Sequence, residues 1–159
     1  MNDAKPIIRD ENEGERRWFY GGGLHLWKAT AEDTNGSFFL FVDELVRGKT
    51  TPLHRHPDQD EMVYVIDGEI LYSGGGVERR VGRGATIVTP RGIPHAFLVV
   101  SESARLLFLQ TPASGQAFYR EASEPAQAED GPVDFSKIRE AAAATGATVV
   151  MGPPPFQKP

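Results

Sequence analysis

Two histidines, His54 and His56, stand two residues apart in the segment TTPLHRHPDQDEMVYVIDGE, and the chain contains only four. In a strand, residues i and i+2 point to the same side, so both imidazoles would face one way and Arg55 the other. Imidazole is a common ligand of transition metals, and the pair therefore indicates a metal site. A chance pair or a pH-sensitive surface patch would have the same spacing.

A carboxylate and a third histidine could complete such a site. Glu61 opens the apolar run EMVYVI after a short turn, and either Glu61 or its neighbour Asp60 can face inward from a strand, but not both. His95 opens the run HAFLVV after the turn PRGIP. If the strand of His95 packs across from the strand of His54 and His56, three nitrogens and one oxygen converge, with positions left open for water or substrate. The alternative is that His95 caps a turn and Glu61 is solvated.

The composition excludes several other kinds of chemistry. The 159 residues include no cysteine, which rules out disulfides, thiolate metal sites and cysteine nucleophiles. The net charge is -5 and no block of basic residues occurs, so neither nucleic acid nor an anionic membrane is expected as a partner. The N-terminal segment lacks the apolar stretch of a signal peptide, and we expect a cytoplasmic protein.

The spacing of apolar runs predicts an all-β domain. Runs rich in Val, Ile, Phe, Tyr and Leu alternate with glycine or proline about every 8–12 residues, as in a sandwich or barrel. The expected strands are 16–20, 23–29, 37–45, 52–56, 61–66, 69–73, 77–81, 85–89, 95–100 and 104–110. The glycine triplet at 74–76 is interpreted as a hairpin turn. Neither it nor the triplet at 21–23 has the strand-to-helix setting of a dinucleotide-binding fingerprint.

The chain divides into three parts by composition. Residues 1–15 are polar and are expected to form an arm, residues 16–112 form the β-barrel, and residues 113–159 form an extension rich in Ala, Glu, Ser and Pro. One helix is expected at about 135–144, between an N-cap at Asp134 and Gly146. Its apolar side is predicted to lie against the barrel exterior, so that the extension shapes access to the barrel and supplies no ligand.

The candidate ligands stand among glycines and prolines at fixed offsets. The pattern is Gly48-x5-His54-x-His56-x4-Glu61-x6-Gly68, then Gly84-x5-Pro90-x-Gly92-x2-His95. It resembles the two signature motifs of the cupin superfamily. The resemblance implies a conical antiparallel β-barrel of the jelly-roll type with a metal inside. It also implies that one divalent transition metal (Fe, Mn, Ni, Cu or Zn) is bound by His54, His56, Glu61 and His95. Where the second motif usually has asparagine, this chain has Val99, which indicates a more apolar cavity wall.

Two further segments narrow the resemblance. DTNGSFFLFVDELVRGKTTPLHRH and TPASGQAFYREASEPAQ are similar to single-domain cupins related to bacterial quercetin dioxygenases. That resemblance implies a dioxygenase for a small aromatic or enolic, flavonol-like substrate, with Glu61 as ligand and catalytic base. By strand alternation Phe97 and Val99 are expected to line the substrate pocket, and Phe41 and Trp27 are further candidates. His25 is interpreted as a hydrogen-bonded or exposed strand histidine and not as a ligand.

Other functions remain open at this point. A redox-silent cyclase, lyase or isomerase would use the metal as a Lewis acid, and a non-enzymatic cupin would bind a small molecule without turnover. We also expect a homodimer in which the arm and the strands near 16–29 cover a sheet edge of the partner.

Overall fold

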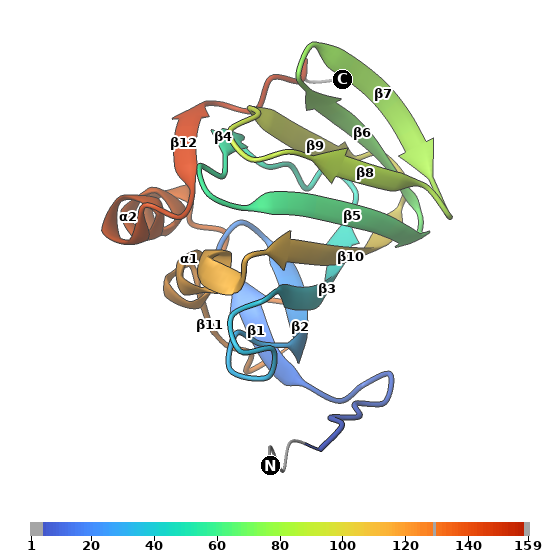
Figure 1. The fold of residues 1–159 in the computed structure, drawn as a ribbon. Helices are drawn as coiled ribbons and strands as arrows, with labels where there is room; N and C mark the ends of the chain where they lie inside the picture. The colour runs from blue at the N-terminus through green and yellow to red at the C-terminus, as the bar shows by residue number, and fades with distance from the viewer. Residues whose placement is uncertain (1–4, 129, 158–159) are drawn as a thin grey trace.

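The computed structural model describes residues 5–128 and 130–157 (Figure 1). Residues 1–4 of the expected arm and residues 129, 158 and 159 of the extension lie outside this range. The elements in chain order are β1 (Glu15–Phe19), β2 (Gly23–Ala29), β3 (Phe39–Val46), β4 (Leu53–Arg55), β5 (Asp60–Asp67), β6 (Glu69–Gly74), β7 (Val77–Gly82), β8 (Thr86–Thr89), β9 (His95–Val99), β10 (Ser103–Thr111), the 3₁₀ turn η1 (Ala113–Gly115), α1 (Gln116–Glu121), β11 (Ser123–Pro125), α2 (Phe135–Thr145) and β12 (Val149–Gly152).

The strands form two antiparallel sheets in a jelly-roll arrangement. The larger sheet has the order β11-β1-β2-β3-β10-β5-β8, and the smaller has the order β12-β4-β9-β6-β7. Within the described residues these are two hydrogen-bonded sheets rather than one closed ring. The all-β class and the cupin-type jelly roll expected from the sequence are thus confirmed, and each expected strand has a counterpart in the structure.

Alternation along the strands places the core between the sheets. In β10, buried Ala104, Leu106, Phe108 and Gln110 alternate with more exposed neighbours. In β5 the buried positions are Glu61, Val63 and Val65. Because successive side chains of a strand point to opposite faces, each strand sends one row inward. Glu61 therefore lies in the same inward row as two core valines.

The segment after Pro112 contains elements that the sequence did not predict. Besides α2, it forms η1, α1 and two short strands. β11 pairs with β1, and β12 pairs with β4, so the segment adds an outer strand to each sheet. Strand β1, which was expected to cover a sheet edge of a partner, thus pairs with β11 of its own chain. The homodimer itself stays a prediction.

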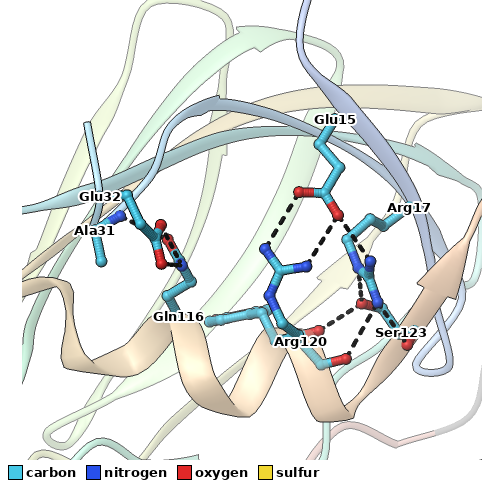
Figure 2. Close-up of polar contacts among 8 residues, drawn as sticks. Glu15, Arg17, Ala31, Glu32, Gln116, Arg120 and Ser123 are labelled. Carbon is cyan, nitrogen blue, oxygen red and sulfur yellow. Dashed lines mark hydrogen bonds and ion pairs between the residues drawn. The ribbon is translucent and has the colours of Figure 1, made fainter. Parts of the chain in front are cut away.

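Helix α1 and the residues after it are fastened to β1 and to the loop after β2 by polar contacts, as Figure 2 shows. Arg120 forms an ion pair with Glu15 at 3.0 Å. Arg17 donates from Nε to Ser123 Oγ at 2.7 Å. At the other end of the helix, the Gln116 side-chain oxygen accepts a hydrogen bond from the Ala31 backbone N–H at 2.7 Å. These contacts fix the position of α1, which carries Tyr119 into the core.

Helix α2 has the ends expected from its sequence. The Asp134 side chain accepts hydrogen bonds from the backbone N–H groups of Ser136 and Lys137, and Gly146 follows the last turn. In Figure 1 the helix lies beside β12 and β4, and its Ile138 is buried. None of the described helices is long and apolar enough to span a bilayer.

Candidate metal centre

Strands β4 and β9 place two histidines opposite each other. His54 and His95 are direct partners in the antiparallel register, and their ring centroids are 4.4 Å apart. His56 directly follows β4, and its ring lies 5.1 Å from His54 and 5.4 Å from His95. The strand that begins at His95 therefore packs beside the strand that carries His54. We call His54, His56 and His95 the three-histidine cluster.

The outer ring nitrogen of each histidine is already bonded. His54 Nδ1 lies 2.8 Å from the Pro52 carbonyl, and His95 Nδ1 lies 2.9 Å from the Ile93 carbonyl. A carbonyl can only accept, so the Nδ1–H donates in both cases and the neutral ring keeps a lone pair on Nε2. His56 Nδ1 lies 3.1 Å from Thr148 Oγ1. Such partners of the second nitrogen fix ring orientation in metal-binding histidines.

Glu61 enters the cluster from β5. Its Oε1 lies 3.2 Å from His95 Nε2, and its Oε2 lies 3.2 Å from His56 Nε2. Asp60 points the other way and forms an ion pair with Arg91 at 2.9 Å. The choice between the two neighbouring carboxylates is therefore made by the register of β5, which turns Glu61 inward.

Burial and the neighbouring charges set the ionisation of the cluster. Burial would raise the pKa of Glu61, but His56 and His95 hold that pKa well below its ordinary value. Burial lowers the pKa of His54 to about 3, and the neighbouring His95 and His56 add to the effect. Burial also acts to lower the pKa of His95, but the hydrogen bond to Glu61 outweighs it and the net shift is upward. His54 is thus neutral and Glu61 ionised near neutral pH.

Gln110 and Tyr119 extend the cluster, and sequence reasoning did not single them out as site residues. Gln110 Nε2 donates to Glu61 Oε2 at 2.8 Å and lies 3.2 Å from the Tyr119 hydroxyl. Burial, followed by the charge of Glu61, raises the pKa of Tyr119 well above its ordinary value, so the phenol stays protonated. The sequence offered only their positions as an indication, because Gln110 is the last residue of an expected strand and Tyr119 lies within FYRE.

The donor set fits a transition metal. Within the described residues, the candidate ligand nitrogens of the three-histidine cluster all lie within 4.8 Å of one another. Their inward lone pairs and the Glu61 carboxylate face one another, which is repulsive unless a proton or a cation lies between them. The cluster could therefore hold a metal ion. Glu61 contacts two of the three rings, so its role as a fourth ligand stays a prediction.

Comparisons with known proteins agree with this geometry. Residues 41–110 match the family described as Cupin domain. An uncharacterised protein of Streptomyces coelicolor is 32% identical over 108 residues, which cover 68% of this chain and 96% of that protein. The chain belongs to the cupin superfamily.

Two other relatives differ from this cupin in length or sequence. Quercetin 2,3-dioxygenase of Bacillus subtilis is 23% identical over 136 residues, which cover 86% of this chain and 40% of that enzyme. The cupin described here thus spans well under half of that enzyme's length. The crystal structure of an RmlC-like cupin from Shewanella frigidimarina aligns with a TM-score of 0.60 at 17% identity, over 69% of this chain and 93% of that one. That likeness supports the fold alone.

The cupin cavity opens beside the cluster and has largely aromatic walls. It has a volume of about 50 Å³ and reaches His54, Glu61 and His95. The aromatic lining residues are Phe19, Phe41, Phe97, Phe108, Phe118, Tyr119 and Phe135. Phe135 and Ile138 of α2 belong to the lining, so the helix borders the cavity instead of lying only on the barrel exterior.

Two of the four predicted pocket residues lie elsewhere. Phe41 and Phe97 line the cavity, whereas Trp27 and Val99 do not. Both are 1% exposed and belong to the core. Trp27 packs edge-on against Phe39, and Val99 pairs with Ile70. Alternation correctly predicted their inward face but carried no information about how far along the strand the cavity extends.

Proposed function

We propose that this cupin is a metal-dependent dioxygenase that acts on a small aromatic or enolic substrate. One observation carries the proposal: three imidazoles and an ionised carboxylate converge beside a cavity with aromatic walls. The similarity to quercetin 2,3-dioxygenase of Bacillus subtilis supports the same choice of reaction.

The three-histidine cluster and Glu61 would hold one divalent transition metal. When bound, such a metal supplies Lewis acidity and, in the case of Fe, Mn or Cu, redox chemistry with O₂. The protein contributes orientation, because backbone carbonyls hold the His54 and His95 rings through Nδ1. Thr148 does the same for His56.

Glu61 would accept the proton of the substrate hydroxyl. Its carboxylate is ionised, since His56 and His95 hold its pKa well below the ordinary value against the effect of burial. Gln110 Nε2 donates to Oε2 at 2.8 Å, which fixes the plane of the carboxylate. A base held within hydrogen-bonding reach of an enol or phenol increases the rate by about 10²–10⁴-fold.

The cavity restricts the size of the substrate. A volume of about 50 Å³ corresponds to roughly four water positions, since each needs about 10–15 Å³ on this measure. That space suits one substituted ring better than the three rings of a flavonol. Phe41, Phe97 and Phe108 would pack against the ring and exclude bulk water from it.

The test combines metal analysis with oxygen consumption. Protein purified without chelator should contain about one transition metal per chain and consume O₂ with catechol or 3-hydroxy-4-pyranone, both one-ring substrates. The matched control is the Glu61→Gln protein, which keeps the shape of the site but lacks the base. Conversion at an equal rate under nitrogen would replace the dioxygenase with a Lewis-acid cyclase, lyase or isomerase. Binding without conversion would leave a small-molecule-binding cupin.

A further inference from the structure

A second pair of imidazole and carboxylate lines the same cavity. His25 and Asp43 are direct partners in the register of β2 and β3, and His25 Nε2 lies 3.4 Å from Asp43 Oδ2. Their exposed fractions are 1% and 4%. Both residues belong to the larger sheet, whereas His54 and His95 belong to the smaller one. We call these two residues the His25–Asp43 pair.

The pair has unused hydrogen-bonding capacity. Among the described residues, neither ring nitrogen of His25 has a hydrogen-bond partner, and Asp43 Oδ1 has none either. Buried polar groups are nearly always bonded in native proteins, and a bound water or ligand is one explanation of an exception. The His25 ring is held instead by stacking between Phe19, at 4.7 Å, and Phe41, at 4.5 Å. Stacking fixes the ring plane and leaves the ring edges free.

The charges around the pair favour a ligand that donates a hydrogen bond. Lys49 also lines the cavity, and its Nζ donates to the Gly21 carbonyl. Burial lowers the pKa of Lys49 to about 8, although the Asp43 carboxylate acts to raise it. The ammonium thus offsets the charge of Asp43. A carboxylate opposite Nε2 places the proton of a neutral ring there, which leaves Nδ1 as an acceptor.

The glycine triplet at 21–23 makes room for this arrangement. A Cβ on Gly23 would lie only 2.3 Å from Asp43 Oδ1, and a Cβ on Gly21 would lie 2.8 Å from Lys49 Nζ. Real Cβ atoms do not approach other atoms so closely, so a larger residue at either position would displace the buried charges. Close packing beside the cavity thus explains why residues 21 and 23 of the triplet are glycine.

We propose that the His25–Asp43 pair is a second polar binding site in the cavity, which accepts hydrogen bonds from a hydroxyl group of the ligand. The ligand class is a single-ring compound with an oxygen at each end, one for the three-histidine cluster and one hydroxyl for His25. Phe41 and Phe108, stacked at 5.0 Å, form the apolar wall for the ring. Only the assignment of the first end rests on the proposed function.

The test compares two ligands that differ at one ring position, where the first has a hydroxyl and the second a methyl group of similar size. Benzene-1,4-diol and 4-methylphenol are titrated into zinc-loaded protein under nitrogen, so that binding is measured by calorimetry without turnover. We expect the wild-type protein to bind the diol about tenfold more tightly, which corresponds to one hydrogen bond to a buried acceptor. The His25→Phe protein keeps an aromatic ring in the stack and should lose that preference. Its metal content and circular dichroism serve as the check on folding.

A wild-type measurement makes the test independent of that variant. The ¹⁵N resonance of His25 Nδ1 should shift with the diol and stay in place with 4-methylphenol. The absence of a tenfold preference, an unchanged preference in a folded His25→Phe protein, or equal ¹⁵N shifts with both ligands would each overturn the proposal. If the preference depends on His25 but no compound drives oxygen consumption, the binding site stands and the dioxygenase assignment fails.

Discussion

The two groupings of imidazole and carboxylate in the cavity differ in how their nitrogens are used. In the three-histidine cluster each Nδ1 has a protein partner, while in the His25–Asp43 pair neither nitrogen has one among the described residues. The cluster rings are thus oriented by bonds on their outer side, and their inner nitrogens converge. The His25 ring is held by stacking alone. The difference teaches that the same residue types can be fixed by hydrogen bonds in one place and by ring stacking, with unbonded nitrogens, in another.

The largest effect is expected for Glu61→Gln, which separates the role of Glu61 as a base from its role as a metal ligand. In the Glu61→Gln protein the amide cannot take up a proton, so turnover should fall by about 10²–10⁴-fold while part of the metal is retained. The measurement is oxygen consumption, normalised to metal content by elemental analysis. A turnover loss no larger than the metal loss would contradict the role of Glu61 as a base.

The next test compares the metal affinity after one substitution in each of the two groupings. His95→Ala should weaken metal binding by more than about 100-fold, since even the partners of ligands are worth about 10–100-fold. The matched control is His25→Phe, which should keep the metal affinity of the wild-type protein. Competition with a chromogenic chelator measures both. If His25→Phe lost metal as His95→Ala does, the distinction between the two groupings would fail.

Substitution of Thr148, the partner of His56, should have a smaller effect on metal affinity. Thr148→Val removes the hydroxyl beside His56 Nδ1 but keeps the shape of the side chain. We expect the metal affinity to fall by about 10–100-fold, because the ring loses its fixed orientation. Thr148→Ser retains the hydroxyl and should restore most of the affinity in the same chelator assay. Equal affinities of the Val and Ser variants would show that Thr148 contributes only packing.

The smallest changes are expected with pH. Metal affinity should rise with pH, whereas the stability of the metal-free protein should fall. The metal competes with a proton for His95, whose pKa is raised above 6.5, so affinity should fall up to about tenfold per pH unit below that raised pKa. His54, with a pKa of about 3, adds no proton competition near neutral pH. Without metal, the raised pKa of His95 contributes stability that is fully present below 6.5 and lost as the pH rises through the folded-state value. Thermal unfolding of both forms from pH 5 to 8 measures the contrast, and parallel trends would contradict it.

The sequence predicted the three-histidine cluster because its spacing is local. His54 and His56 stand two residues apart in the sequence, and glycine and proline turns bracket Glu61 and His95. Trp27 and Val99 do not line the cavity, because alternation defines a face and not a depth. The relevant depth depends on where the cavity ends, which is set by the packing of many side chains together.

The sequence could not reveal partners that depend on long-range register. His25 faces Asp43 only because β2 and β3 pair in one particular alignment across a loop, and neither residue is part of a spaced motif. Thr148 reaches His56 from 92 positions away along the chain. Strand β12 has only four residues, too few for a periodic signal.

The pairing of β12 with β4 also has a consequence for the order of assembly during synthesis. Val150 is the register partner of His54, so the strand that carries His54 lacks its outer neighbour until β12 has been synthesised. A nascent chain therefore exposes three imidazoles before Thr148 can orient the second of them. Because chains emerge from the N-terminus, the three-histidine cluster reaches its final geometry only after Thr148 and β12 have been synthesised, well after its own residues.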